Sequence, residues 1–157
     1  MATPQHDLWP AALGNGANTM TNTPVGLLNE QASFLATKTN NVVKAEVLTQ
    51  PLELKASASM LPKGYPQQGF RHKFYLLAPA LGNFRYLLFE IGQPIEMYPL
   101  VIIAAPTEDE IGISNQDEFM EALRKIFAHQ KTQNVIEAMR AQSADVASQF
   151  GAGLKAA

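Results

Sequence analysis

The residues of this chain that could carry out chemistry are few and scattered. Its three histidines are His6, His72 and His129, and none has another histidine or an acidic residue at the spacing of metal ligands. The sequence contains no cysteine, which excludes thiolate nucleophiles, disulfides and cysteine-based zinc sites. It has no G-x-S-x-G nucleophile turn and no glycine-rich phosphate loop after a strand. We therefore predict no cofactor, no metal ion and no catalytic residues.

A group of acidic residues is the next candidate for chemistry. It consists of Glu108, Asp109 and Glu110, followed by Asp117 and Glu118. The spacing differs from that of an EF-hand loop, which needs ligands at alternate positions around a central glycine. We interpret the group as a solvated acidic loop whose negative charge favours the N-terminus of the helix that follows it.

Cations and aromatic residues alternate in the segment FRHKFYLLAPALGNFRYLLFEI, residues 70–91. The segment is typical of a β-hairpin, with strands near 70–78 and 84–91 joined through Pro79, Gly82 and Asn83. Side-chain alternation places Arg71, Lys73 and Tyr75 on one face of the first strand. On the second strand, alternation groups Arg85 with Leu87, Phe89 and Ile91. The register between the strands depends on the turn, so the sequence leaves open whether Arg85 shares a face with Arg71.

These residues define the predicted binding site. The candidates are six cationic or aromatic side chains of the sheet: Arg71, Lys73, Tyr75, Arg85, Tyr86 and Tyr98. Three cations with a tyrosine among them resemble the surfaces on which single-stranded nucleic acids stack. The whole chain has a net charge of −2, which lacks the basic balance typical of nucleic-acid binders. A nucleic acid is therefore an alternative partner.

Protein contacts are the function that the sequence favours. Apolar residues on both parities of the strands predict a sheet that is apolar on both faces: Leu77, Leu87, Phe89, Ile91, Tyr98, Leu100 and Ile102. Three short helices can hardly cover both faces, and an exposed apolar patch marks a protein interface. We expect a small non-enzymatic adaptor, chaperone-like or regulatory, that binds a protein partner or forms a homodimer. A second alternative is a small enzyme with an acid-base site formed by His72, Glu90 and Glu96.

The elements that position these residues begin with an N-terminal helix. Thr23 and Pro24 form a helix start, and apolar residues recur at helical spacing to Lys38, so the sequence predicts a helix over 24–38. VVKAEVLT and LELKASASM then predict two short strands, separated at Gln50-Pro51 because proline cannot donate to a sheet. LPKGYPQQG predicts a loop, and IEMYPLVIIAA predicts a strand over about 95–104.

The sequence of the C-terminal third predicts two helices. Either Ser114 or Asn115 begins a capping box, and a helix with an apolar stripe follows. Thr132 is predicted to cap a third helix that fades into small and polar residues. The fold class is therefore α+β, with an N-terminal helix, an antiparallel meander of four to five strands, and one to two C-terminal helices packed on the sheet. Many small bacterial binding proteins share this order of elements, and a shared fold assigns no function.

Length and composition fit one domain. The 157 residues are enough for a single core, and we divide them into a flexible N-terminal tail (1–22), an α+β domain (23–145) and a frayed C-terminal tail (146–157). The first residues lack the basic and apolar regions of a secretory signal. The longest apolar-rich run, YPLVIIAAP, is too short to cross a bilayer. We expect a cytoplasmic protein with no membrane partner.

Overall fold

The structure is a computed structural model that describes residue 8 and residues 23–53, 65–66, 68–105 and 109–156. It is an α+β fold in which one five-stranded antiparallel sheet has the strand order β1-β2-β3-β4-β5. The elements follow the chain as α1 (Pro24–Lys38), β1 (Lys44–Glu53), β2 (Gln68–Ala78), the short 3-10 helix η3 (Pro79–Leu81), β3 (Phe84–Gln93), β4 (Leu100–Ala104), β5 (Glu110–Ile113), α2 (Gln116–Ala128) and α3 (Gln130–Ala156). The predicted fold class is confirmed.

Helix α1 has the predicted bounds because residues at its start and after its end favour helix initiation and termination. The Thr23 hydroxyl accepts a hydrogen bond from the Gly26 N–H at 3.1 Å, and Pro24 occupies the first turn, where its missing N–H costs nothing. After Lys38 the chain turns through Asn40 and Asn41, which have φ angles of 52° and 65°. Asparagine tolerates this left-handed conformation better than most residues.

The prediction of two strands around Pro51 is wrong. β1 is one continuous strand that passes through Gln50 and Pro51, with Pro51 opposite Phe70 of β2. Proline is tolerated here because β1 is an edge strand, with a neighbour on one side only. The second predicted strand lies mostly outside the described residues.

The β2–β3 hairpin forms as predicted, but its register contains a β-bulge. Phe74 lies opposite Phe89, whereas the next residue, Tyr75, lies opposite Leu87. The extra residue of β3 is Leu88, and both Leu88 and Phe89 are buried in the main core. The bulge therefore changes the alternation of β3, so that Leu87 and Phe89 lie on opposite faces of the sheet.

Two predictions about the later strands need correction. The predicted strand over 95–104 forms only at Leu100–Ala104, because Pro94 and Pro99 interrupt it and Met97 has a φ angle of 81°. A strand at Glu110–Ile113, which the sequence had assigned to the acidic loop, pairs with β4 as β5. The sheet therefore reaches the upper limit of the predicted strand number.

The cap of α2 is one of the two that the sequence predicted, whereas the predicted cap of α3 is wrong. Asn115 caps α2 by accepting a hydrogen bond from the Glu118 N–H at 2.9 Å, while the Glu118 carboxylate accepts from the Ser114 N–H at 2.7 Å. Thr132 does not cap α3, because the helix begins earlier, at Gln130. The buried hydroxyl of Thr132 instead donates to the carbonyl of Ile126 at 2.6 Å. Helix α3 continues to Ala156. The predicted division into tails and domain stays a prediction.

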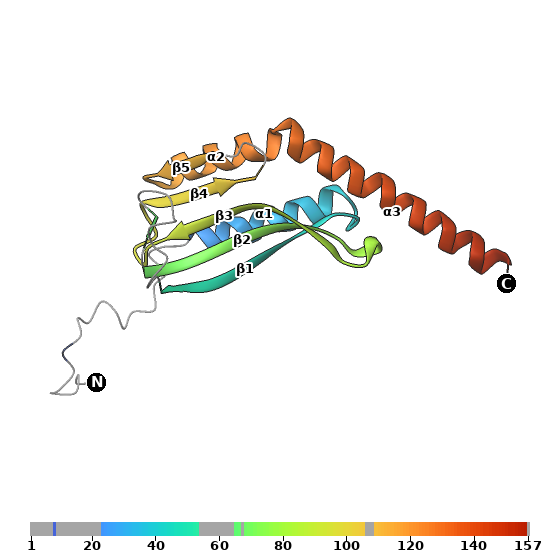
Figure 1. Cartoon of the computed structure of the whole chain (residues 1–157), viewed down its shortest axis with the longest axis horizontal. Coiled ribbons are helices and arrows are strands. Elements are labelled where there is room, and N and C mark those ends of the chain that lie inside the picture. Colours follow the sequence, from blue (N-terminus) through green and yellow to red (C-terminus); the bar gives the residue numbers. More distant parts are fainter. Residues whose placement is uncertain (1–7, 9–22, 54–64, 67, 106–108, 157) are drawn as a thin grey trace, which may run out of the picture.

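The main core lies between one face of the sheet and the three helices. Phe74 and Phe89 stack with ring centroids 4.9 Å apart, and Phe127 of α2 packs against both rings. Figure 1 shows α1 and α2 behind the sheet, while α3 runs past the β2–β3 turn and beyond the end of the sheet. We call the side of the sheet that carries Phe74 and Phe89 and packs on the helices the covered face, and the opposite side the uncovered face.

Candidate binding face of the sheet

The uncovered face is formed by side chains that lie opposite one another across the strands. One row joins Lys44, Leu77 and Arg85, the next joins Glu46, Tyr75 and Leu87, and the third joins Leu48, Lys73, Glu90, Ile103 and Glu110. Leu48 and Leu87 expose 37% and 36% of their surface. The face therefore mixes apolar and charged side chains in nearly equal measure.

Four of the six predicted site residues lie together on this face. Lys73 lies opposite Glu90, Leu77 lies opposite Arg85, and Arg71 and Tyr75 share the face with them. Arg85 joins this group because the bulge at Leu88 reverses the alternation of β3. Phe89 and Ile91, which the sequence had grouped with Arg85, lie in the core instead. The covered face is therefore apolar as predicted, whereas the uncovered face keeps Leu77 and Leu87 among charged side chains.

The other two candidates lie elsewhere. Tyr86 is opposite Leu76 and belongs to the covered face. Tyr98 lies in the loop before β4 and packs against the main core, with its hydroxyl buried and without a hydrogen-bond partner among the described residues. Burial raises the pKa of the Tyr98 hydroxyl. Neither tyrosine contributes to the group around Tyr75.

Arg71 is held by neighbours at one end of the face. Its Nε donates to the Tyr65 hydroxyl at 3.2 Å and lies 3.2 Å from a carboxylate oxygen of Glu90. The Tyr65 hydroxyl in turn donates to Glu90 at 3.4 Å. The hydrogen bond that Arg71 donates to Tyr65 raises the pKa of Arg71, and burial raises the pKa of Tyr65. Arg71 is therefore a structural cation rather than a free one.

The sequence interpretation missed Tyr65, which it placed in a loop. Tyr65 is 7% exposed and packs with Leu52 and Val101 in a small second core on the uncovered face. Its ring lies on Gly92, where an added Cβ would come within 2.5 Å of the tyrosine Cζ. A glycine inside a strand indicates such a close approach. Gly92 was therefore the signal that could have predicted a cover at this end of the sheet.

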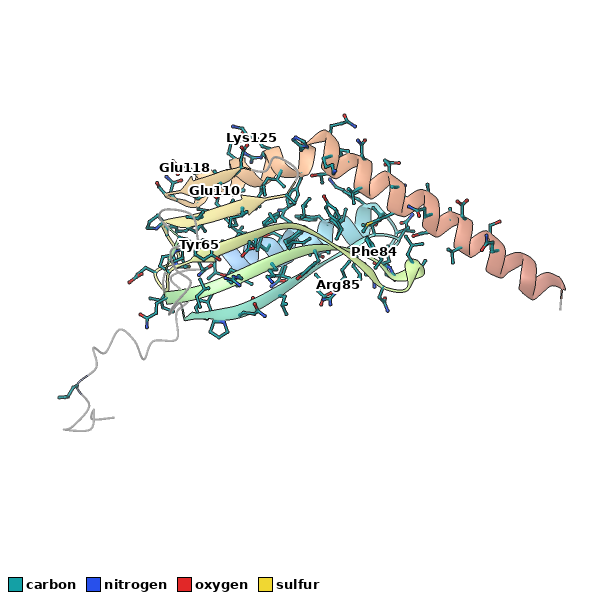
Figure 2. All side chains as sticks on the ribbon, viewed as in Figure 1. Tyr65, Phe84, Arg85, Glu110, Glu118 and Lys125 are labelled. Carbon is teal, nitrogen blue, oxygen red and sulfur yellow. The ribbon has the colours of Figure 1, made fainter. Side chains whose placement is uncertain are left out.

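Arg85 lies at the other end of the face (Figure 2). Its guanidinium lies 5.1 Å from the centre of the Tyr75 ring, and its Nη1 lies 3.5 Å from the Glu46 carboxylate. The contact with Tyr75 is a cation–π interaction, and it occupies the ring that a base would need for stacking. Arg71 and Arg85 thus form ion pairs with acids of the same face, and Lys73 lies opposite Glu90, which lowers the positive potential of the face.

His72 is a buried polar residue of the covered face. Its Nδ1 lies 2.9 Å from the Thr49 hydroxyl and its Nε2 lies 2.9 Å from the Gln93 side-chain oxygen, so both ring nitrogens are satisfied. Burial lowers the pKa of His72, against the smaller opposing effect of the bond to Gln93. A neutral ring that donates Nε2–H to Gln93 and accepts from Thr49 fits both contacts.

The acid-base site predicted from His72, Glu90 and Glu96 is not assembled. His72 lies opposite Ile91, whereas Glu90 lies opposite Lys73, so the two side chains are on opposite faces of the sheet. Within the described residues, no group of three histidine or acidic side chains could hold a metal ion. Likewise, no helix in the described part of the chain has the length and apolarity needed to cross a bilayer.

Comparison with protein-family models, curated proteins and solved structures finds no match for this chain. Similarity therefore assigns no function, and the function has to be argued from the two faces of the sheet.

Proposed function

We propose that this chain is a protein-binding module that contacts a partner through the uncovered face of its sheet. The role is that of an adaptor rather than an enzyme, and the proposed location is the cytoplasm. A sheet face needs a cover when it carries large apolar side chains, because their exposure to water is unfavourable. Binding of a protein with a matching surface would remove them from water.

The observation that carries this proposal is the apolar centre of the uncovered face. Leu77 and Leu87 lie directly beside Tyr75 and Leu48 lies diagonally from it, and the charged residues next to them are balanced between acids and cations. Interfaces of transient protein complexes have this composition, with aromatic and aliphatic groups at the centre and polar groups at the rim. Balanced charges favour a protein surface with both signs over a polyanion.

The nucleic-acid alternative has less support. Phosphate binding needs cations that are free to release counterions on contact, and Arg71 and Arg85 lie beside Glu90 and Glu46. Tyr75 is already covered by a guanidinium. Lys73 lies opposite Glu90 in the sheet, and of the three predicted cations it is the one for which the described residues show no ion pair.

The test compares acidic substitutions on this face with one elsewhere. The double variant Leu48→Glu with Leu87→Glu places two carboxylates on the uncovered face, while Ile95→Glu introduces one at a residue that is 68% exposed in the β3–β4 loop. Partner binding or self-association of the full chain, measured by sedimentation velocity and by affinity capture, is expected to be lost in the double variant and kept in Ile95→Glu. An unchanged set of partners in the double variant, or a monomer that captures nothing, would contradict the proposal.

A further inference from the structure

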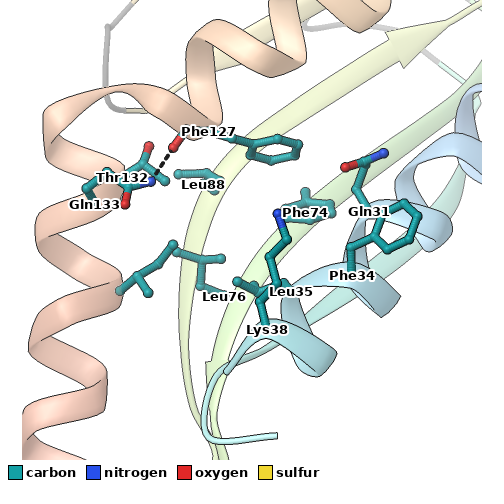
Figure 3. Close-up of a pocket in the computed structure, with 11 residues that line it drawn as sticks. Gln31, Phe34, Leu35, Lys38, Phe74, Leu76, Leu88, Phe127, Thr132 and Gln133 are labelled. Carbon is teal, nitrogen blue, oxygen red and sulfur yellow. Dashed lines mark hydrogen bonds between the residues drawn. The ribbon is translucent and has the colours of Figure 1, made fainter. Parts of the chain in front are cut away.

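The covered face contains a cavity where the helices do not meet. The cavity has a volume of about 190 Å³ and lies between α1, the sheet and the start of α3. Figure 3 shows α1 on one side, α3 on the other, and β2 and β3 as the floor. It is lined by Gln31, Phe34, Leu35, Lys38, Phe74, Leu76, Leu88, Phe127, Thr132, Gln133 and Ile136. We call it the α1–α3 cavity.

The floor of the α1–α3 cavity is apolar. Phe74 and Leu76 are each 1% exposed and Leu88 is fully buried, so these side chains close the bottom of the cavity. Phe34 lines one side of the cavity and is 50% exposed, so half of its surface is free to pack against another group. An apolar cavity of about 150 Å³ is large enough for benzene. The α1–α3 cavity therefore accepts a slender apolar group.

A second hollow lies next to the cavity, between α1 and α2. It has a volume of about 150 Å³, is lined by Leu27, Met120 and Leu123, and shares Gln31 and Phe127 with the first. Its remaining lining residue, Arg124, is ion-paired with Glu121 at 3.0 Å. Two adjacent hollows that share lining residues fit an extended chain better than a compact ring.

The mouth of the α1–α3 cavity carries one cation. Lys38 extends from α1 over the cavity in Figure 3, and none of the other lining residues is charged. No acidic residue of the described chain pairs with Lys38. The polar groups beside it are amides: Gln31, and Gln133, which donates to the Phe127 carbonyl at 2.7 Å. An apolar slot with a single unpaired ammonium at its mouth complements an apolar chain that ends in a negative charge.

We propose that the α1–α3 cavity binds the alkyl chain of a linear monocarboxylate, such as a fatty acid of medium length. The chain lies between the accessible side chains of Phe34, Phe127 and Ile136, above the buried floor, and the carboxylate pairs with the ammonium of Lys38 at the mouth. This site is on the opposite side of the sheet from the proposed protein-binding face and does not depend on it.

The experiment titrates the full chain with octanoate, decanoate and dodecanoate below their micelle concentrations, by isothermal calorimetry. Each added methylene that enters the cavity is expected to tighten binding about fourfold. Dodecyltrimethylammonium has the same chain with a positive head group and is expected to bind at least about tenfold more weakly than dodecanoate. In NMR spectra, chain protons of dodecanoate are expected to show cross-relaxation with the rings of Phe34 and Phe127.

Two variants test the position of the ligand. Gln31→Trp fills the mouth from a partly exposed site and is expected to abolish dodecanoate binding without changing the thermal midpoint. Glu30→Trp adds the same side chain at the neighbouring exposed residue and is expected to bind like the wild type. Lys38→Gln is expected to weaken dodecanoate about tenfold, since it removes a charge-assisted hydrogen bond, while Lys44→Gln on β1 is expected to have no effect.

Three results would overturn the proposal. The first is binding that does not saturate or does not depend on chain length. The second is equal affinity for dodecanoate in the wild type, in Gln31→Trp and in Lys38→Gln, together with no cross-relaxation to the two rings. The third is a wild-type dimer that Gln31→Trp dissociates, since a second copy would then occupy the cavity.

Discussion

The two faces of this sheet are made from the same strands but are stabilised in different ways. On the covered face, Phe74, Phe89 and Ile91 are almost fully buried, and the polar His72 is accepted only because both of its nitrogens are satisfied. On the uncovered face, charged side chains lie between leucines and are held by neighbours such as Glu46 and Glu90. One face is organised by burial and the other by side-chain pairing.

This difference indicates on which face a substitution changes the stability of the fold and on which face it changes binding. Removing a methyl group from the covered face leaves a cavity, whereas the uncovered face can change its side chains with little cost to the fold. Binding surfaces are therefore expected where substitution is tolerated, and the predictions below measure the contrast between the two faces.

The largest contrast is expected between two adjacent residues of β3. Leu88 is fully buried and Leu87 is 36% exposed. Leu88→Ala is expected to lower the free energy of unfolding by about 3 kcal/mol, because it removes apolar contacts and leaves a cavity. Leu87→Ala is expected to change it by no more than about 0.5 kcal/mol. Urea unfolding of both variants measures the difference, and equal losses would show that the uncovered face is buried in the isolated protein.

A second contrast lies within the uncovered face, between Gly92 and Gly112. A Cβ at Gly92 would meet the Tyr65 ring at 2.5 Å, whereas a Cβ at Gly112 meets nothing within 4 Å. Gly92→Ala is expected to displace Tyr65 and to cost about 1–3 kcal/mol, and Gly112→Ala is expected to be neutral or slightly stabilising. Because Tyr65→Ala removes the ring that the new Cβ would meet, Tyr65→Ala and Gly92→Ala are expected to be non-additive. Equal effects at both glycines would show that Tyr65 does not pack on the sheet.

The buried histidine makes the covered face sensitive to pH. Because burial lowers the pKa of His72, the folded protein binds the proton less readily than the unfolded chain, in which the histidine pKa is about 6.5. The stability from His72 is complete above pH 6.5 and is lost as the pH falls below it, by at most about 1.4 kcal/mol per pH unit. Urea unfolding at several pH values should show this loss, and His72→Gln should reduce it. The same pH dependence in both proteins would contradict the assignment.

The smallest effect is expected from the surface pair at the other end of the uncovered face. Arg85→Ala removes the contacts with Glu46 and Tyr75 and is expected to cost less than about 1 kcal/mol, because exposed ion pairs gain little in water. A double-mutant cycle with Glu46→Ala measures the pair, and added salt should weaken it further. A coupling of several kcal/mol would mean that this face is shielded from water.

Much of the fold could be predicted from local patterns. The bounds of α1 follow from Thr23, Pro24 and the asparagines after Lys38, and the cap of α2 follows from Asn115 and Glu118, because these contacts join residues three to five positions apart. The prediction of a strand break at Pro51 was wrong because a strand tolerates proline when it lies at the edge of a sheet, and the local sequence does not show that β1 is an edge strand. Thr132 was misread because its partner is a carbonyl in the preceding helix.

The candidate site was predictable in part. Alternation correctly placed Arg71, Lys73 and Tyr75 together, since it acts within one strand. It could not place Arg85 with them or separate Phe89 from Leu87, because the bulge at Leu88 belongs to the pairing of two strands. It also could not find Tyr65, whose role depends on Gly92 in a distant strand.

The sequence by itself therefore determined the element types, the α+β class and the side chains that share one face of a strand, because these depend on neighbours along the chain. The tertiary structure alone decided which strand faces combine, which face the helices cover and where a cavity remains between α1 and α3. The physical reason is that register, bulges and helix packing are set by contacts between segments far apart in sequence, and the local pattern carries no record of them.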